Sequence, residues 1–167
     1  LSAALSGTPA NQLSIVPTED TALRAAVDGC FNCFYDARSD FALASNVHHT
    51  LDKLSQHLPL VGITNGNVNA QKVGLDRYFT AILHASVERP MKPAQNMFDE
   101  AASLVKVTPS HILHVGDNII KDVFGAINAG YQSAWFACNR PMQLKFEPIS
   151  VLPHVQLDSL EELIQFV

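Results

Sequence analysis

Charged residues are scarce in this chain of 167 residues, at 16% of the total, and they sum to a net charge of −5. Without an excess of Lys and Arg the chain has no broad basic face, which argues against binding to nucleic acid or to an anionic membrane. Apolar runs are short, and because none reaches about 18 residues, the sequence predicts no membrane-spanning segment. The hydrophobic content of 47% is instead typical of one globular domain with a buried core.

Cysteine is also rare, with Cys30, Cys33 and Cys138 as the complete set. An odd number without a secretory leader predicts reduced thiols and a cytoplasmic protein. Cys30 and Cys33 form a C-x-x-C pair, which can make a redox disulfide or half of a zinc site. No second pair completes a zinc site, so we expect both to be ordinary half-buried side chains of a helix.

The N-terminal part of the chain has the pattern of helices without strands. We expect a segment upstream of Leu1, because the sequence starts there without Met, and we expect residues 1–17, rich in small and polar residues, to be loop. Thr18 is a suitable N-cap for the apolar spacing of three and four that follows it. The sequence therefore predicts an amphipathic helix over 21–35 and a second helix over 47–57.

After Pro59 short apolar runs alternate with helical segments. The predicted strands are 60–64, 81–85, 112–116 and 133–138, and the predicted helices between them are 94–106 and 119–129. Strands that alternate with helices form a parallel sheet covered on both faces, so the predicted fold class is α/β with three layers. In such a sheet ligands bind beyond the carboxyl ends of the strands.

A few residues mark helix ends or the core of this predicted sheet. Pro93 suits the first position of a helix and Gly130 a C-terminal cap. The run from Asp158 to Glu161 has the character of a capping box and predicts a last helix. His114 lies within a strand, where we expect a hydrogen-bonded core residue, and Trp135 is expected in the core of the last parallel strand.

The first predicted strand ends in Thr64, Asn65 and Gly66. A hydroxyl, an amide and free backbone N–H groups at this point can hold a phosphate or another oxyanion. Asn-Gly is also a common signal for a tight turn, and that alternative stays open.

Lys92 follows the second predicted strand and stands just before Pro93. A cation near the start of a helix is poorly placed for stability, because the helix dipole there favours anions. A lysine that balances the charge of a bound phosphate explains this position, and an exposed loop lysine is the alternative.

The third predicted strand ends in Gly116 and Asp117, and Asp122 lies one turn into the next helix. Mg²⁺ prefers oxygen ligands and keeps several waters, so one or two carboxylates are enough to bind it. Asp117 can bind the metal directly, with Asp122 orienting a water, Lys121 or Lys92 around it. Alternatively, both acids only cap the helix.

Together, these three elements resemble the conserved blocks of the haloacid dehalogenase superfamily. The run Thr64-Asn65-Gly66 is similar to its second motif, Lys92-Pro93 to its third, and 116–122 to its fourth, in the same order. An acidic residue at the position of Asp117 resembles the Mg²⁺-dependent phosphatase branch, since true dehalogenases usually have a neutral residue there. Within that branch the chain resembles the bacterial subgroup that includes the 5-amino-6-(5-phosphoribitylamino)uracil phosphatase.

The resemblance implies a Rossmann-like three-layer core over residues 46–167, preceded by the remainder of a helical cap over 1–45. It also implies hydrolysis of a small phosphorylated metabolite through an aspartyl-phosphate intermediate. In that reaction Thr64, Asn65 and Gly66 bind the phosphoryl group, Lys92 neutralises charge, and Asp117 with Asp122 holds Mg²⁺.

The sequence departs from the family pattern at one place. No Asp-x-Asp block follows an apolar strand anywhere in residues 1–167, so the nucleophile, the general acid and the central strand of the family's sheet are missing. We therefore expect this chain by itself to be inactive, and we expect a missing N-terminal segment or a second copy to fill the sheet. The alternatives are a non-catalytic module that binds phosphate or metal, and a receiver-like domain, which needs an acidic pair near its start.

Overall fold

Five short strands and the helices between them make up the part of the chain that the computed structural model describes, residues 19–148 and 151–167. Strand β1 (Val61–Thr64) pairs in parallel with β2 (Ala81–His84), so that Ile63 faces Leu83. Strand β4 (Gln132–Trp135) pairs in parallel with β3 (Leu113–Gly116) on one side and with β5 (Val155–Gln156) on the other. All strand pairs are parallel, as the sequence predicts.

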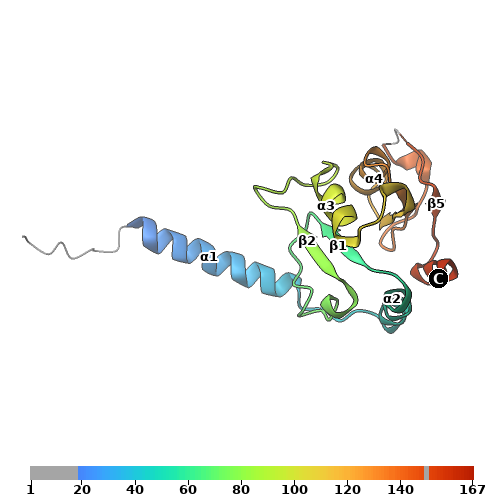
Figure 1. Cartoon of the computed structure of the whole chain (residues 1–167). Coiled ribbons are helices and arrows are strands. Elements are labelled where there is room, and N and C mark those ends of the chain that lie inside the picture. Colours follow the sequence, from blue (N-terminus) through green and yellow to red (C-terminus); the bar gives the residue numbers. More distant parts are fainter. Residues whose placement is uncertain (1–18, 149–150) are drawn as a thin grey trace, which may run out of the picture.

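Helices cover both faces of the strands (Figure 1). On one face, α2 (Ser45–His57) and a 3₁₀ segment (Leu160–Phe166) contribute Leu54 and Leu163 to a core that includes Ala134 of β4. On the other face, α3 (Asn96–Val105) and α4 (Gly125–Asn128) contribute Phe98 and Ala126, both fully buried. The predicted three-layer α/β/α fold is confirmed.

Strands β1 and β3 belong to different sheets, and each has one edge without a strand partner in the described part of the chain. The carbonyls of Leu60 and Thr64 accept hydrogen bonds from the β2 side, at 2.8 and 2.9 Å. In a parallel strand alternate residues bond to opposite neighbours, so the backbone groups of Val61 and Ile63 face the other edge.

Strand β3 shows the same arrangement. The carbonyls of Ile112 and Gly116 both accept hydrogen bonds at 2.9 Å from the β4 side, which leaves Leu113 and Val115 with their backbone groups toward the unpaired edge. The strands of the described residues thus divide into two sheets, and β1 and β3 each have one open edge.

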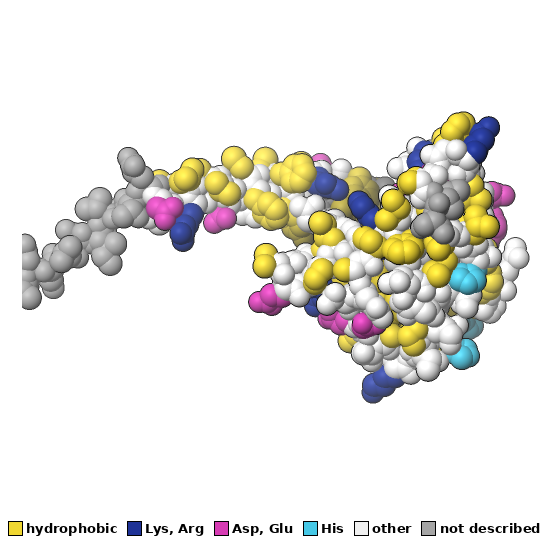
Figure 2. Space-filling view, turned by 90° about the horizontal axis from the view of Figure 1, so that it is seen from above, with side chains coloured by type: hydrophobic (Ala, Val, Ile, Leu, Met, Phe, Trp, Pro, Cys, Tyr) yellow, Lys and Arg dark blue, Asp and Glu magenta, His cyan; other side chains and the backbone are white. Residues whose placement is uncertain are grey.

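The predicted N-terminal helix is confirmed and extends further than expected, as α1 (Glu19–Arg38). It projects away from the sheets (Figure 1), and its apolar side chains remain in solvent (Figure 2). Leu23, Val27, Phe31 and Phe34 are each more than half exposed. The expectation of half-buried cysteines was wrong, since Cys30 and Cys33 are exposed on this helix, as is Cys138 in a loop. The predicted cap at Thr18 lies outside the described residues.

Several predicted boundaries need correction. Pro93 does not open a helix: the Lys92–Pro93 peptide is cis, and α3 begins only at Asn96. The predicted helix over 119–129 is a π-helical turn (Ile119–Phe124) followed by α4. Gly130 has a φ of +80° after the end of α4, which confirms its predicted role at the helix C-terminus.

The C-terminal region also differs in detail. Strand β4 ends at Trp135, earlier than predicted, and it is not the last strand, because β5 follows it in the sheet. Trp135 is fully buried, as expected. The capping box forms between Ser159 and Glu162 and starts a 3₁₀ segment, so the predicted box was placed one residue too early.

None of the helices in residues 19–148 and 151–167 has both the length and the apolar content needed to cross a bilayer.

Candidate active site

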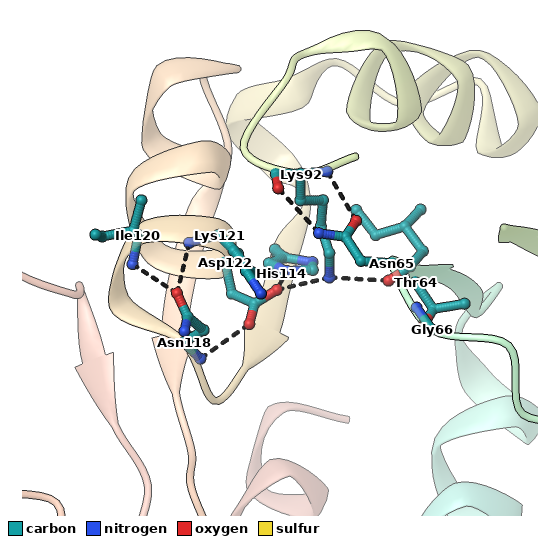
Figure 3. Close-up of polar contacts among 10 residues, drawn as sticks. Thr64, Asn65, Gly66, Lys92, His114, Asn118, Ile120, Lys121 and Asp122 are labelled. Atoms are coloured by element: carbon teal, nitrogen blue, oxygen red, sulfur yellow. Dashed lines mark hydrogen bonds and ion pairs between the residues drawn. The ribbon is translucent and has the colours of Figure 1, made fainter. Parts of the chain in front are cut away.

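A cavity of about 240 Å³ opens at the carboxyl ends of β1 and β3. It brings together the candidate site residues predicted from the sequence, which come from three separate segments. Figure 3 shows all of them except Asp117. The lining residues are Thr64, Asn65, Gly66, Lys92, Asp117, Asn118, Lys121 and Asp122. Asn118 was missed by the sequence analysis, although its place between a strand and a helix is typical of an N-cap.

The ammonium group of Lys92 connects the two sheets. Its Nζ donates to Oδ1 of Asp122 at 2.6 Å and to the carbonyl of Ile63, on the unpaired edge of β1, at 2.9 Å. The side chains of Lys92 and Asp122 are only 10% and 6% exposed, so this is a buried ion pair. Lys92 is therefore not the exposed loop lysine of the alternative interpretation.

The carboxylate of Asp122 is held by three donors. Oδ1 accepts from Lys92 and lies 3.1 Å from Nε2 of His114, and Oδ2 accepts from the backbone N–H of Asn118 at 2.9 Å. Burial alone would raise the pKa of Asp122, but the hydrogen bond from His114 and the charge of Lys92 outweigh it and hold the pKa well below its usual range. Asp122 is therefore an ionised carboxylate whose two oxygens are already occupied.

The helix cap is provided by Asn118 and not by the acids. Its Oδ1 accepts hydrogen bonds from the backbone N–H groups of Ile120 at 3.0 Å and Lys121 at 2.8 Å. The alternative interpretation, in which Asp117 and Asp122 only cap this helix, is therefore wrong.

Asn65 uses its side chain to hold the loop of Lys92. Its Nδ2 donates to the carbonyl of Lys92 at 2.9 Å, and its Oδ1 accepts from the Lys92 N–H at 2.8 Å. This two-way pairing keeps the backbone before Pro93 in a loop, which explains why the predicted helix starts later. Thr64 accepts a hydrogen bond from the N–H of Gly66 at 2.9 Å, so its own hydroxyl hydrogen is free to donate to a ligand.

Asp117 has the more open of the two carboxylates, with its side chain 61% exposed. Its backbone carbonyl is fixed by Nε1 of Trp135 and by Arg140, both at 2.8 Å, while the nearest cation to the carboxylate is Arg140 at 3.7 Å. A hard divalent cation therefore finds one available carboxylate here. The described residues contain no group of three His, Cys, Asp or Glu that could hold a metal by themselves.

His114 confirms the expectation of a buried, hydrogen-bonded histidine, and its partner is Asp122. Burial lowers the pKa of His114, and the nearby charge of Lys92 acts in the same direction, while the hydrogen bond to Asp122 opposes them. The net result is a histidine that stays neutral in the folded chain more readily than in the unfolded chain.

This shift predicts that acidification destabilises the fold. Because the folded pKa of His114 is lowered, the unfolded chain takes up its proton first as the pH falls through about 6.5, and stability is lost below that value. Between about pH 7.5 and pH 5, where Asp122 stays ionised in both states, His114→Phe should lose less unfolding free energy than the wild type. One group contributes at most about 1.4 kcal/mol per pH unit.

Urea unfolding at both pH values measures this difference, with His111→Phe as the control for an exposed histidine of the same region. Equal pH dependence in the wild type and His114→Phe would show that His114 does not titrate differently on folding.

Comparison with known proteins agrees with this site. A family model that describes haloacid dehalogenase-like hydrolases matches residues 12–130. The chain belongs to this hydrolase family.

Its relatives include phosphatases of small molecules. The chain is 35% identical over 130 residues to the 5-amino-6-(5-phospho-D-ribitylamino)uracil phosphatase YigB of Escherichia coli, and 29% identical over 147 residues to the human N-acylneuraminate-9-phosphatase. These alignments cover 78% and 84% of this chain but only 55% and 58% of the relatives. The chain thus spans little more than half the length of either relative.

A similar solved structure is the 2-haloacid dehalogenase from Pseudomonas syringae pv. Tomato DC3000, with a TM-score of 0.78 and 29% identity. The match covers 89% of this chain and 63% of that chain. It agrees with the three-layer fold described above.

Proposed function

We propose that residues 1–167 form the larger part of a Mg²⁺-dependent phosphatase that acts on a small phosphorylated metabolite. The observation that carries the proposal is the buried pair of Lys92 and Asp122, which places an ammonium group in the cavity that Thr64 of β1 and Asp117, just after β3, also line. The names of the two relatives, one acting on a ribityl phosphate and the other on a sugar-acid phosphate, support the substrate class.

Six of the residues that line the cavity have a part in this proposal. The Thr64 hydroxyl and the N–H groups around Gly66 bind phosphoryl oxygens, and Lys92 offsets their negative charge. Asp117 supplies a carboxylate for Mg²⁺, which when bound polarises the phosphoryl oxygens. Asp122 holds the Lys92 ammonium in place, and Asn65 holds the backbone of Lys92 through two hydrogen bonds.

The nucleophile has to come from outside residues 1–167, as an aspartate that forms an aspartyl-phosphate and is then freed by water. We propose that an extended segment carrying an Asp-x-Asp block pairs with the unpaired edges of β1 and β3 and ends beside Lys92. It belongs to another part of the same protein or to a second copy. Residues 1–45 would then be part of a cap domain and 46–167 the core that receives the strand.

Hydrolysis of p-nitrophenyl phosphate tests this proposal when residues 1–167 are compared with the product of the complete reading frame that encodes them. We expect Mg²⁺-dependent turnover by the complete product and none above background by residues 1–167. A folded complete product that binds phosphate without hydrolysing any ester would favour a non-catalytic binding module instead.

A further inference from the structure

His114 is a buried polar side chain that the proposed reaction does not use. It lies in the middle of β3 with its side chain 11% exposed, and its ring points toward the cavity residues (Figure 3). The hydrogen-bond partner that the structure gives its Nε2 is Oδ1 of Asp122, at 3.1 Å. The same oxygen accepts the Lys92 ammonium at 2.6 Å, so His114 and Lys92 meet on one atom.

The direction of this hydrogen bond is fixed by chemistry. An ionised carboxylate only accepts hydrogen bonds, so Nε2 of His114 must carry the proton and donate it. A ring that donates while staying uncharged adds no second cation next to Lys92. The positive charge that faces the cavity therefore stays on the lysine.

The ring of His114 is itself held in one orientation by the core. It meets Phe98 edge to face, with the centroids 5.1 Å apart and the planes at 77°. Phe98 is fully buried, packs in the same way on Tyr131, and accepts a hydrogen bond from the Tyr131 hydroxyl at its carbonyl. Rotation of the His114 ring would break this packing, so Nε2 is aimed at Asp122 by the rigid layer behind it.

We propose that His114 is a positioning residue, which fixes the Asp122 carboxylate so that Lys92 is held between the unpaired edge of β1 and the cavity. With two of its three N–H groups committed to Asp122 and Ile63, the ammonium has one left for a ligand in the cavity. If His114 no longer donates, Asp122 can turn about its side-chain bonds and Lys92 loses its fixed direction. The catalytic importance of this arrangement rests on the proposed function, in which Lys92 binds the phosphate. The contacts among His114, Asp122 and Lys92 do not depend on that function.

The test measures the chemical reactivity of the Lys92 amine and does not require enzymatic activity. Residues 1–167 are treated with a limiting amount of acetic anhydride, and mass spectrometry compares acetylation of Lys92 with that of the exposed Lys53 in the same sample. In the wild type we expect Lys92 to react much more slowly than Lys53. In His114→Phe, which keeps an aromatic ring but removes the donor, Lys92 should react faster by about tenfold, the factor that corresponds to one lost hydrogen bond to a charged group.

A matched variant separates the donor from the ring. His114→Gln keeps an N–H group at similar reach and should leave Lys92 as protected as in the wild type. The proposal is overturned if Lys92 stays protected in His114→Phe, or if folded Phe and Gln variants expose it equally. His114→Leu, which also lacks the donor, provides the same comparison should the Phe variant fail to fold.

A kinetic measurement on the complete reading frame then connects the geometry to the reaction. We expect His114→Phe to lower kcat more than it changes KM, with recovery in His114→Gln. If the complete product hydrolyses no ester, the proposed function fails while the acetylation result still decides the role of His114.

Discussion

Replacement of Lys92 by Met should produce the largest loss of stability of any single exchange of a cavity side chain. It leaves the Asp122 carboxylate, which is 6% exposed, without its cation. Breaking a buried pair from one side costs about 3–5 kcal/mol, because the remaining charge is neither solvated nor neutralised. Urea unfolding of residues 1–167 measures the change, and Lys53→Met on the exposed face of α2 should stay within about 0.5 kcal/mol of the wild type.

The double variant makes this expectation sharper. When Asp122→Asn is added to Lys92→Met, no buried charge remains, so the double variant should be more stable than the sum of the two single losses implies. Strict additivity of the two losses would mean that Lys92 and Asp122 do not depend on each other. In the complete reading frame, Lys92→Met should lower hydrolysis by about 10²–10³, the usual effect of removing one group that stabilises transition-state charge.

Gly116→Ala is the second large expectation. A Cβ atom at Gly116 would overlap the Asp122 side chain, including its Cβ and Cγ atoms. Strand β3 cannot move away easily, because Gly116 is paired with Trp135, which is fully buried. The added methyl must therefore displace Asp122, and the cost combines overpacking with the loss of a buried network, about 3 kcal/mol or more.

A glycine elsewhere in the chain provides a matched control. A Cβ at Gly29, within α1, would have no other atom within 4 Å, so Gly29→Ala adds the same methyl group without a clash. Alanine is the better helix former, and we expect this variant to gain about 0.5–1 kcal/mol. The contrast between the two exchanges is measured by urea unfolding, and equal stability of Gly116→Ala and the wild type would contradict the packing around Asp122.

The positions of the candidate site residues could be predicted because they depend on local pattern. Thr64 and Asp117 each follow a short apolar run, and parallel strands bring their carboxyl ends to one edge of a sheet. The structure places both residues on the same cavity. The fold class could also be predicted from local pattern, because strands that alternate with helices along the chain form a parallel α/β sheet.

The partners of these residues could not be predicted with the same success. The sequence analysis predicted water, Lys121 or Lys92 as the partner of the Asp122 carboxylate. In the structure the partner is Lys92, which lies 30 residues away in the sequence. His114 was expected to have a partner, but only the three-dimensional position of β3 against the π-helical turn shows that it is Asp122. Contacts of this kind depend on the distance between elements, which periodicity does not contain.

The remaining errors have local physical causes. Pro93 was expected to begin a helix, but Asn65 pairs with the backbone of Lys92 and holds that segment as a loop. Cys30 and Cys33 were expected to be half-buried because apolar helix faces are normally covered. In the described part of the chain α1 projects away from the sheets, so its face stays open (Figure 2).

The role of Asp117 as a metal ligand is tested by the Mg²⁺ dependence of p-nitrophenyl phosphate hydrolysis by the product of the complete reading frame, with and without Asp117→Ala. Asp117 is exposed at the cavity, and the ion pair of its carboxylate with Arg140 is long, at 3.7 Å, and lies in solvent, so its loss should disturb the fold little. We predict Mg²⁺-dependent hydrolysis in the wild type, a loss of about 10²-fold or more in Asp117→Ala, and wild-type activity in the surface control Asp52→Ala. Hydrolysis that is independent of Mg²⁺, or unchanged in a folded Asp117→Ala variant, would contradict the claim that this site is the metal-dependent half of a phosphatase.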